Sequence, residues 1–250
     1  KTAAKNFLAA YAGTNAAANR QLAIVTFATG YNTVMGWTNV AGGENQNGYD
    51  TAYDKINSLG AEGGTNLEGG LYLAKGLYTD SRFNSPVVNI ESKSVITLTD
   101  GVPTYRINGG LGDRGSERNN SAAANQATAI KNAGANLYTV CFGVADETTY
   151  SGGPTVGNFL RDSIASSDCA YTADNSAQLN AAFAAISESI TSGLSGDGWT
   201  ATDPMAPHIS VAGGTGDSFY KDGAHYTWEL SNVTTQTEGS TTYYVYTYTY

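Results

Sequence analysis

Two polar side chains in the sequence stand where a divalent cation could be bound. Thr65 lies in the stretch GGTNLEGG (residues 63–70), which leads into an apolar pattern of helical period. Asp100 directly follows the apolar stretch SVITLT (residues 94–99). A hydroxyl and a carboxylate are hard oxygen ligands of the kind that Mg²⁺ prefers. In an open parallel sheet, ligands bind outside the carboxyl ends of the strands, which is where Asp100 is expected to lie.

Each of these side chains also has a purely structural interpretation. Thr65 is followed three residues later by Glu68, which is the pattern of a capping box with Thr65 as the helix N-cap. Asp100 followed by Gly101 is typical of a turn. The residues alone leave both interpretations open at both positions.

The elements that would position these residues alternate along most of the chain. Helical spacing of apolar residues is found in residues 1–12, 49–59, 66–79, 121–133, 156–166 and 176–192. Short apolar runs typical of buried strands are found at 22–28, 94–99, 135–144 and 169–173. This alternation predicts an α/β fold with a doubly wound, mostly parallel sheet and helices on both faces.

The character of the sequence changes near residue 194. Beyond it, strand-like runs at 208–211, 226–230 and 243–250 replace the helical period. We therefore expect two domains, residues 1–194 and 195–250, the second being part of an antiparallel β-sandwich. Both ends of the sequence resemble the interior of an element, so we expect this chain to be a fragment of a longer one.

Composition excludes several classes of function. Charged residues make up 14 % of the chain and the net charge is −9, so no cationic stripe is present to neutralise nucleic-acid phosphates. The sequence contains no apolar run of about 18 residues, so no transmembrane helix is predicted. The sequence contains no P-loop, no Gly-x-Ser-x-Gly and no Cys/His pair placed for nucleophilic catalysis, so we do not expect an enzyme.

The order and spacing of four stretches resemble a von Willebrand factor type A domain. These stretches are LAIVTFA, GGTNLEGGL, SVITLTDGVPT and LYTVCFGV, and the resemblance covers residues 1 to about 194. In that family, which has a Rossmann-like fold, a metal-ion-dependent adhesion site holds Mg²⁺ (or Mn²⁺ or Ca²⁺) with three loops. One loop carries Asp-x-Ser-x-Ser, the second a Thr and the third an Asp.

The resemblance implies particular roles for residues of this chain. Thr65 and Asp100 would be metal ligands, Asn66, Gly101 and Arg114 would contact the bound protein, and the loops at 30–48 and 101–120 would shape that contact. The sequence contains no Asp-x-Ser-x-Ser triplet. We therefore expect the first strand of the family fold to be missing here and the metal site to be incomplete.

The C-terminal stretches narrow the resemblance. TATDPM (200–205), YTWEL (226–230) and YYVYTYTY (243–250) resemble the segment that follows the A domain in Gram-positive, sortase-anchored surface and pilus-tip proteins. This implies an extracellular adhesin on the bacterial cell wall or pilus. Its expected partners are a host or extracellular-matrix protein and other pilus or cell-wall components, with no nucleic acid and no membrane insertion within this chain.

Two alternative functions remain open from the sequence. The chain could be a metal-free spacer or assembly module of a surface filament. It could also be a hydrolase of the same architecture whose nucleophile lies on the missing strand, because fold alone does not fix function.

The two cysteines allow two states. Cys141 lies in one predicted strand and Cys169 opens the next, and the family order makes these strands neighbours. A disulfide would suit an extracellular protein. Two buried free thiols are the alternative, because the geometry of a cross-strand disulfide is demanding.

Overall fold

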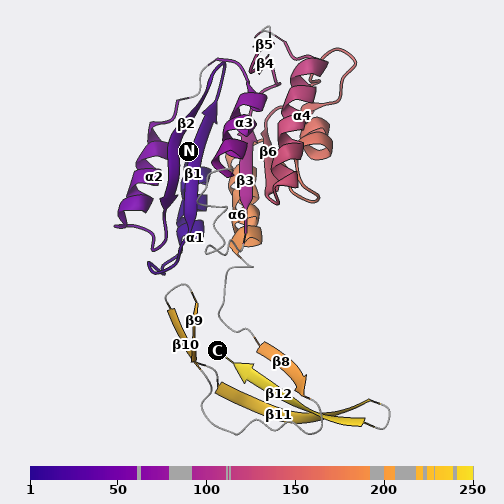
Figure 1. Cartoon of the computed structure of the whole chain (residues 1–250). Helices are drawn as coiled ribbons and strands as arrows, with labels where there is room; N and C mark the ends of the chain where they lie inside the picture. Colours follow the sequence, from indigo (N-terminus) through magenta and orange to yellow (C-terminus); the bar gives the residue numbers. More distant parts are fainter. Residues whose placement is uncertain are drawn as a thin grey trace. The chain divides into compact units, whose positions relative to one another are not determined.

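The computed structural model describes two compact units, Lys1–Gly193 and Leu194–Tyr250, each of which is considered by itself (Figure 1). In the first unit it describes residues 1–60, 63–78, 92–110, 112 and 114–191. In the second it describes the backbone of residues 200–205, 218–221, 224–227, 229–238 and 241–249.

Helices and strands alternate along the first unit. The helices are α1 (Thr2–Ala12), α2 (Asn47–Ser58), α3 (Leu67–Tyr78), α4 (Glu117–Asn132), α5 (Val156–Phe159) with the π-helical segment η2 (Leu160–Ile164), and α6 (Ser176–Thr191). The strands are β1 (Gln21–Phe27), β2 (Tyr31–Asn39), β3 (Ser94–Thr99), β4 (Tyr105–Arg106), β5 (Gly109–Gly110), β6 (Asn136–Phe142) and β7 (Ala170–Ala173).

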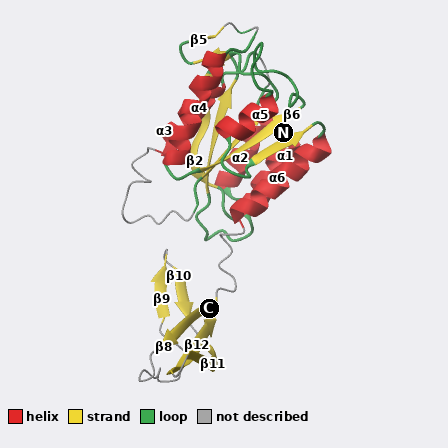
Figure 2. Ribbon diagram, turned by 90° about the vertical axis from the view of Figure 1, so that its right-hand side faces the viewer, coloured by secondary structure: helices red, strands yellow, loops and turns green. Residues whose placement is uncertain are grey.

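Strands β3, β6 and β7 form a parallel sheet in that order, while β1 and β2 form an antiparallel hairpin. Figure 2 shows α3 and α4 on one side of the strand layer and α1 and α6 on the other. This arrangement confirms the predicted α/β fold with a parallel sheet and helices on both faces.

Two clusters of buried apolar side chains hold these layers together. On one side, residues of α3 and α4 such as Leu71 and Ile130 pack with Leu137 of β6. On the other, Leu8 of α1 and Ile56 of α2 pack with residues of the β1–β2 hairpin. Burying a side chain of this size contributes about 1.5–3 kcal/mol, so the two clusters hold these helices against the strands.

Two glycines of α3 bring this helix close to the hairpin. A Cβ atom at Gly69 would overlap the ring of Tyr31, and one at Gly70 would overlap the ring of Phe27. The second glycine pair of GGTNLEGG therefore serves close packing. It sets the N-terminus of α3 at the end of β1 where the chain leaves that strand.

The structure changes two boundaries that the sequence predicted. Residues 31–39, within the predicted contact loop at 30–48, form strand β2 and pair with β1. Helix α4 begins at Glu117, four residues before the predicted start, because the Ser116 hydroxyl accepts a hydrogen bond from the Asn119 N–H and caps it.

The described strands of the second unit form two antiparallel sheets. One has the order β11 (Glu229–Glu238), β12 (Thr241–Thr249) and β8 (Thr200–Met205). The other is a hairpin of β9 (Ser218–Lys221) and β10 (Ala224–Thr227). Within the described part of the chain, no helix is both long enough and apolar enough to cross a membrane.

Candidate functional site

Three loops meet at the edge of the first unit where β1 and β3 end. They follow β1, precede α3 and follow β3, and we call them the sheet-edge loops (residues 28–30, 63–66 and 100–105). The Asn66 N–H donates to the Ala28 carbonyl (2.7 Å), and the Gly64 N–H donates to the Thr29 hydroxyl (3.0 Å). These bonds fix the loop before α3 against the loop after β1.

Backbone hydrogen bonds also join the loop before α3 to the loop after β3. The Thr65 N–H donates to the Thr104 hydroxyl (3.0 Å). The Thr65 carbonyl accepts from the N–H groups of Thr104 (3.0 Å) and Tyr105 (3.1 Å). Both backbone groups of Thr65 are therefore engaged, which holds its side chain at a fixed place beside the end of β3.

The helix cap falls on Asn66, and the capping box predicted for Thr65 is wrong. Helix α3 begins at Leu67, and the Asn66 Oδ1 atom accepts from the Gly69 N–H at 2.9 Å. Glu68, the other half of the predicted box, instead accepts from the Ile107 N–H through Oε2 at 2.7 Å. The cap thus lies one residue later than the sequence pattern indicated.

This cap also leaves no free amide at Asn66. Its Nδ2 atom donates to the Thr29 carbonyl (3.3 Å), and only 3 % of the residue is exposed. A buried side chain with both polar ends in use does not fit the ligand contact predicted for Asn66. Its observed role is to cap α3 and to hold the loop after β1.

The Thr65 hydroxyl lies directly against Gly101. A Cβ atom placed on Gly101 would come within 2.5 Å of the Thr65 Oγ1 atom. The neighbouring Asp100 is exposed. Among the described residues, neither the Thr65 hydroxyl nor the Asp100 carboxylate forms a hydrogen bond, so both oxygen groups stay available at one end of the sheet.

The donor chemistry of this pair suits a hard divalent cation. A hydroxyl and a carboxylate supply oxygen ligands, and Mg²⁺ keeps several waters in proteins. The described residues contain no group of three or more His, Cys, Asp or Glu side chains that could hold a metal ion. Thr65 and Asp100 therefore fit part of a magnesium site, and further ligands would have to complete it.

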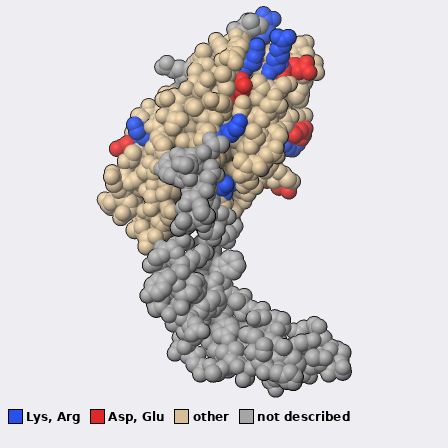
Figure 3. Space-filling model, in the orientation of Figure 1, with Lys and Arg blue, Asp and Glu red and all other residues tan. Residues whose placement is uncertain are grey.

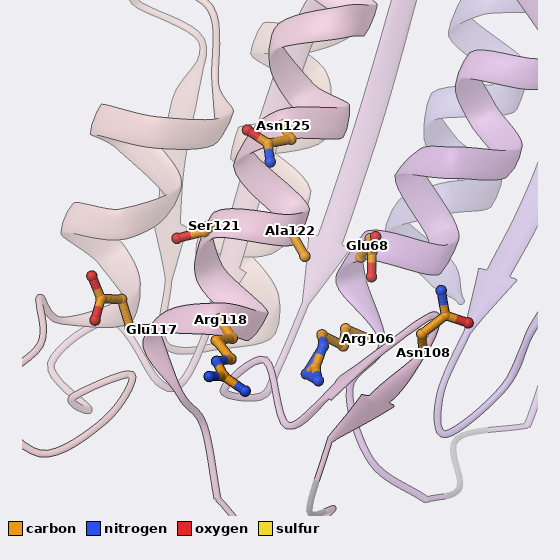
Figure 4. Close-up of a pocket in the computed structure, with 8 residues that line it drawn as sticks. All are labelled: Glu68, Arg106, Asn108, Glu117, Arg118, Ser121, Ala122 and Asn125. Atoms are coloured by element: carbon orange, nitrogen blue, oxygen red, sulfur yellow. The ribbon is translucent and has the colours of Figure 1, made fainter.

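A polar pocket lies next to the sheet-edge loops. It has a volume of about 470 Å³ and is formed by the start of α3, the β4–β5 hairpin and the first turns of α4. Figure 4 shows its lining side chains, which are Glu68, Arg106, Asn108, Glu117, Arg118, Ser121, Ala122 and Asn125. Arg114, predicted to contact the bound protein, is exposed between β5 and α4 and does not line this pocket.

The pocket lies in the most charged part of the visible surface. Figure 3 shows basic and acidic side chains gathered at the end of the first unit that carries β4 and β5, while most of the visible face is uncharged. Only 14 % of the residues in the chain are charged. A cluster of charged side chains at the β4–β5 end of the first unit can therefore contribute electrostatic selectivity for a partner.

The two cysteines are free, buried thiols, so the predicted disulfide alternative does not apply. Cys141 of β6 pairs in register with Thr172 of β7, whereas the Cys169 carbonyl accepts from the Thr139 N–H. The cysteines are thus offset by three residues along neighbouring strands, which is about 10 Å. A disulfide needs Cα atoms closer than about 7 Å.

The fold and the sheet-edge loops define a doubly wound α/β domain with a candidate oxygen-ligand site at its strand ends. Residues 1–102, which include Thr65 and Asp100, match the family model of the von Willebrand factor type A domain. Over these residues the first unit is similar to a von Willebrand factor type A domain. No curated protein sequence matches the chain.

The solved structures that resemble the chain include two of the pilus adhesin SpaC from Lactobacillus rhamnosus GG. One shares 17 % sequence identity with a TM-score of 0.61, and the other, in an open conformation, shares 16 % with a TM-score of 0.62. Each covers 99 % of this chain. The chain spans 35 % and 36 % of the length of those two adhesin chains, respectively. At this identity the likeness is one of fold.

The sequence did not reveal three residues that build the sheet edge. Thr29 and Thr104 bind the loop before α3 from either side, and Glu68 holds the β4–β5 hairpin. Thr29 and Thr104 carry only the signal of short hydroxyl side chains in loops after apolar strands, a pattern shared by ordinary turns. Glu68 was considered only as half of a capping box.

Proposed function

We propose that this chain is a protein-binding, adhesive module that grips its partner through a divalent cation held at the sheet-edge loops. The observation that carries the proposal is the pairing of the Thr65 hydroxyl with Asp100-Gly101, two unengaged oxygen groups from different loops at one strand edge. A bound Mg²⁺ would offer a coordination position to a carboxylate of the partner protein.

The comparisons support the adhesive setting of this proposal. The two similar structures are of a pilus adhesin. We propose by analogy that this chain also acts at a bacterial surface or pilus and meets a host or extracellular-matrix protein, other pilus components or the cell wall. Thr65 and Asp100 would supply only part of the ligand set, since residues 1–250 contain no Asp-x-Ser-x-Ser triplet, so further oxygen ligands are part of the proposal.

The test is a calorimetric titration of Mg²⁺ or Mn²⁺ into a chain that includes the residues preceding Lys1. Asp100→Ala should abolish measurable binding. Thr65→Val, which removes the hydroxyl, should weaken binding about tenfold, whereas Thr65→Ser, which keeps it, should bind within about twofold of the unchanged chain. Equal binding by all variants would contradict the metal roles of both residues, and no binding by the unchanged chain would favour a metal-free spacer.

A further inference from the structure

The polar pocket beside the sheet-edge loops contains two guanidinium groups that form no ion pair or hydrogen bond with the described part of the chain. Arg106 comes from β4 and Arg118 from the first turn of α4, and Figure 4 shows both side chains at the same end of the pocket. Among the described residues, neither guanidinium forms an ion pair or a hydrogen bond. Arg161, by contrast, pairs with the Asp162 carboxylate through two nitrogens, at 2.8 and 3.2 Å.

The acidic side chains of the pocket do not neutralise these arginines. Glu68 already accepts the Ile107 N–H, and Figure 4 shows Glu117 directed away from Arg118. A planar guanidinium with free N–H groups matches the two oxygens of a carboxylate. The pocket therefore offers a carboxylate two forked donors from separate elements.

The mixture of charges indicates which kind of anion would bind. Glu68 and Glu117 stand beside the two arginines, and the chain as a whole carries a charge of −9. Both features repel a polyanion such as nucleic acid or a sulfated glycan. A single carboxylate next to a basic residue complements both the two arginines and the two glutamates of the pocket. Asn108, Ser121 and Asn125 provide hydrogen-bonding groups for the peptide around it.

The pocket is mechanically joined to the sheet-edge loops. The Tyr105 N–H donates to the Thr65 carbonyl (3.1 Å), and the Ile107 N–H donates to Glu68 (2.7 Å). These bonds lie on either side of Arg106, so its backbone is held against the loop that carries Thr65. A segment bound at the pocket would thus lie beside the proposed metal position.

We propose that Arg106 and Arg118 form a docking groove for a protein segment in which an Asp or Glu side chain stands next to a Lys or Arg. This groove adds charge selection to the adhesive contact and, for its biological role, rests on the proposed function. The partner's carboxylate bridges the two guanidiniums, and its neighbouring basic residue lies near Glu68 or Glu117.

The test is an NMR titration that follows the Arg Nε–Hε resonances in the presence of EDTA. The probe is the blocked dipeptide acetyl-Asp-Lys-amide, with acetyl-Asn-Lys-amide as the neutral counterpart. We expect the Asp probe to shift the Arg106 and Arg118 resonances and the Asn probe to leave them in place. Arg106→Gln or Arg118→Gln should each weaken binding about threefold to tenfold, and the double variant should abolish it.

One variant serves as the matched control. Arg161→Gln removes an arginine that is already paired with Asp162, so it should bind the Asp probe as the unchanged chain does. Because EDTA removes divalent ions, a failed metal titration would leave this result standing, and a failed dipeptide titration would leave the metal proposal standing.

Three outcomes would overturn the groove. These are equal shifts with the Asp and Asn probes, unchanged binding of the Asp probe by the double variant, or tighter binding of heparin than of the Asp probe at the same two arginines. The last result would assign the arginines to a polyanion instead of a protein segment.

Discussion

Asn66 holds the start of α3 with both ends of its amide group. Its Oδ1 atom caps the helix at the Gly69 N–H, and its Nδ2 atom reaches the Thr29 carbonyl on the neighbouring loop. Because Asn66 does this work, the adjacent Thr65 hydroxyl is left for another role. Because Asn66 caps the helix, the Thr65 hydroxyl remains available as a ligand group at the sheet-edge loops.

Substitution of Asn66 should therefore cost far more stability than substitution of Thr65. Asn66→Ala removes a cap and leaves the buried Thr29 contact unmade, so we expect the free energy of unfolding to fall by about 1–2 kcal/mol. Thr65→Ala should change it by less than about 0.5 kcal/mol. Urea denaturation measures both, and a larger loss for Thr65→Ala would restore the threonine as the cap.

Gly101 and Thr65 should show energetic coupling. In Gly101→Ala the new methyl group meets the Thr65 hydroxyl at 2.5 Å, whereas the Thr65 Cβ atom lies at an acceptable 3.8 Å. We expect the single variant to lose about 1 kcal/mol, because the threonine must leave its rotamer. Adding Thr65→Ala should recover most of that loss in a double-mutant cycle. Strictly additive losses would contradict the close contact.

At the scale of elements, the register of β6 and β7 determines the state of the cysteines. Burial raises the pKa of both thiols, and the nearby Asp168 raises that of Cys169 further. A raised pKa keeps the thiols protonated near neutral pH, and the thiolate is the reactive form. Buried, protonated and offset along the sheet, they are placed neither to cross-link nor to react.

We expect neither thiol to react with Ellman's reagent at pH 8 in the folded chain, and both to react after unfolding in guanidinium. Intact-mass measurement after mild oxidation should show no loss of two hydrogens. Cys141→Ser and Cys169→Ser report each thiol separately. A disulfide recovered between the two positions would contradict the observed strand register.

The sequence predicted which helices and strands exist better than it predicted where they begin and end. The strands β3, β6 and β7 were predictable because each is a short run rich in apolar and β-branched residues, although only β6 is buried along most of its length. Strand β2 was not, because its residues YNTVMGWTN lack clean alternation and it is defined by pairing with β1. Helix α4 was placed late because its first turn, ERNN, is entirely polar.

At the candidate site, the sequence likewise predicted the position of residues better than their roles. The sequence placed Thr65 and Asp100 at the ends of the right elements, but it could not choose between Thr65 and Asn66 as the cap. Both residue types cap helices well, and a shift of one residue decides which side chain turns inward. The Arg106 groove depends on a two-residue strand, which no periodicity predicts.

At the scale of the whole molecule, tyrosine burial links stability to pH. Burial raises the pKa of Tyr11, Tyr49, Tyr78 and Tyr171 above the ordinary value for tyrosine. Tyr78 has the largest shift, and its hydroxyl donates to the Ser94 carbonyl. These hydroxyls stay protonated in the folded chain at pH values where the unfolded chain begins to ionise.

The sign of the effect follows from proton binding. Above about pH 10, the folded state holds more protons than the unfolded state, so the free energy of unfolding falls as pH rises. The stabilising contribution is complete below the unfolded pKa and is lost progressively above it. For each such tyrosine the slope approaches about 1.4 kcal/mol per pH unit.

We therefore expect urea denaturation to show a modest decline in stability from about pH 8, where the two thiols of the unfolded chain begin to ionise, and a steep decline above about pH 10, where its tyrosines follow. Tyr78→Phe should be less stable than the unchanged chain at pH 8 by about 1 kcal/mol, through loss of the hydrogen bond to Ser94. Because the variant cannot ionise at this position, its decline should be shallower and the two curves should converge at high pH. Tyr72→Phe, which removes a hydroxyl from an exposed side chain, controls for the substitution itself. Parallel curves for Tyr78→Phe and the unchanged chain would mean that Tyr78 ionises alike in the folded and unfolded states, and that its burial between α3 and β3 does not hold the proton.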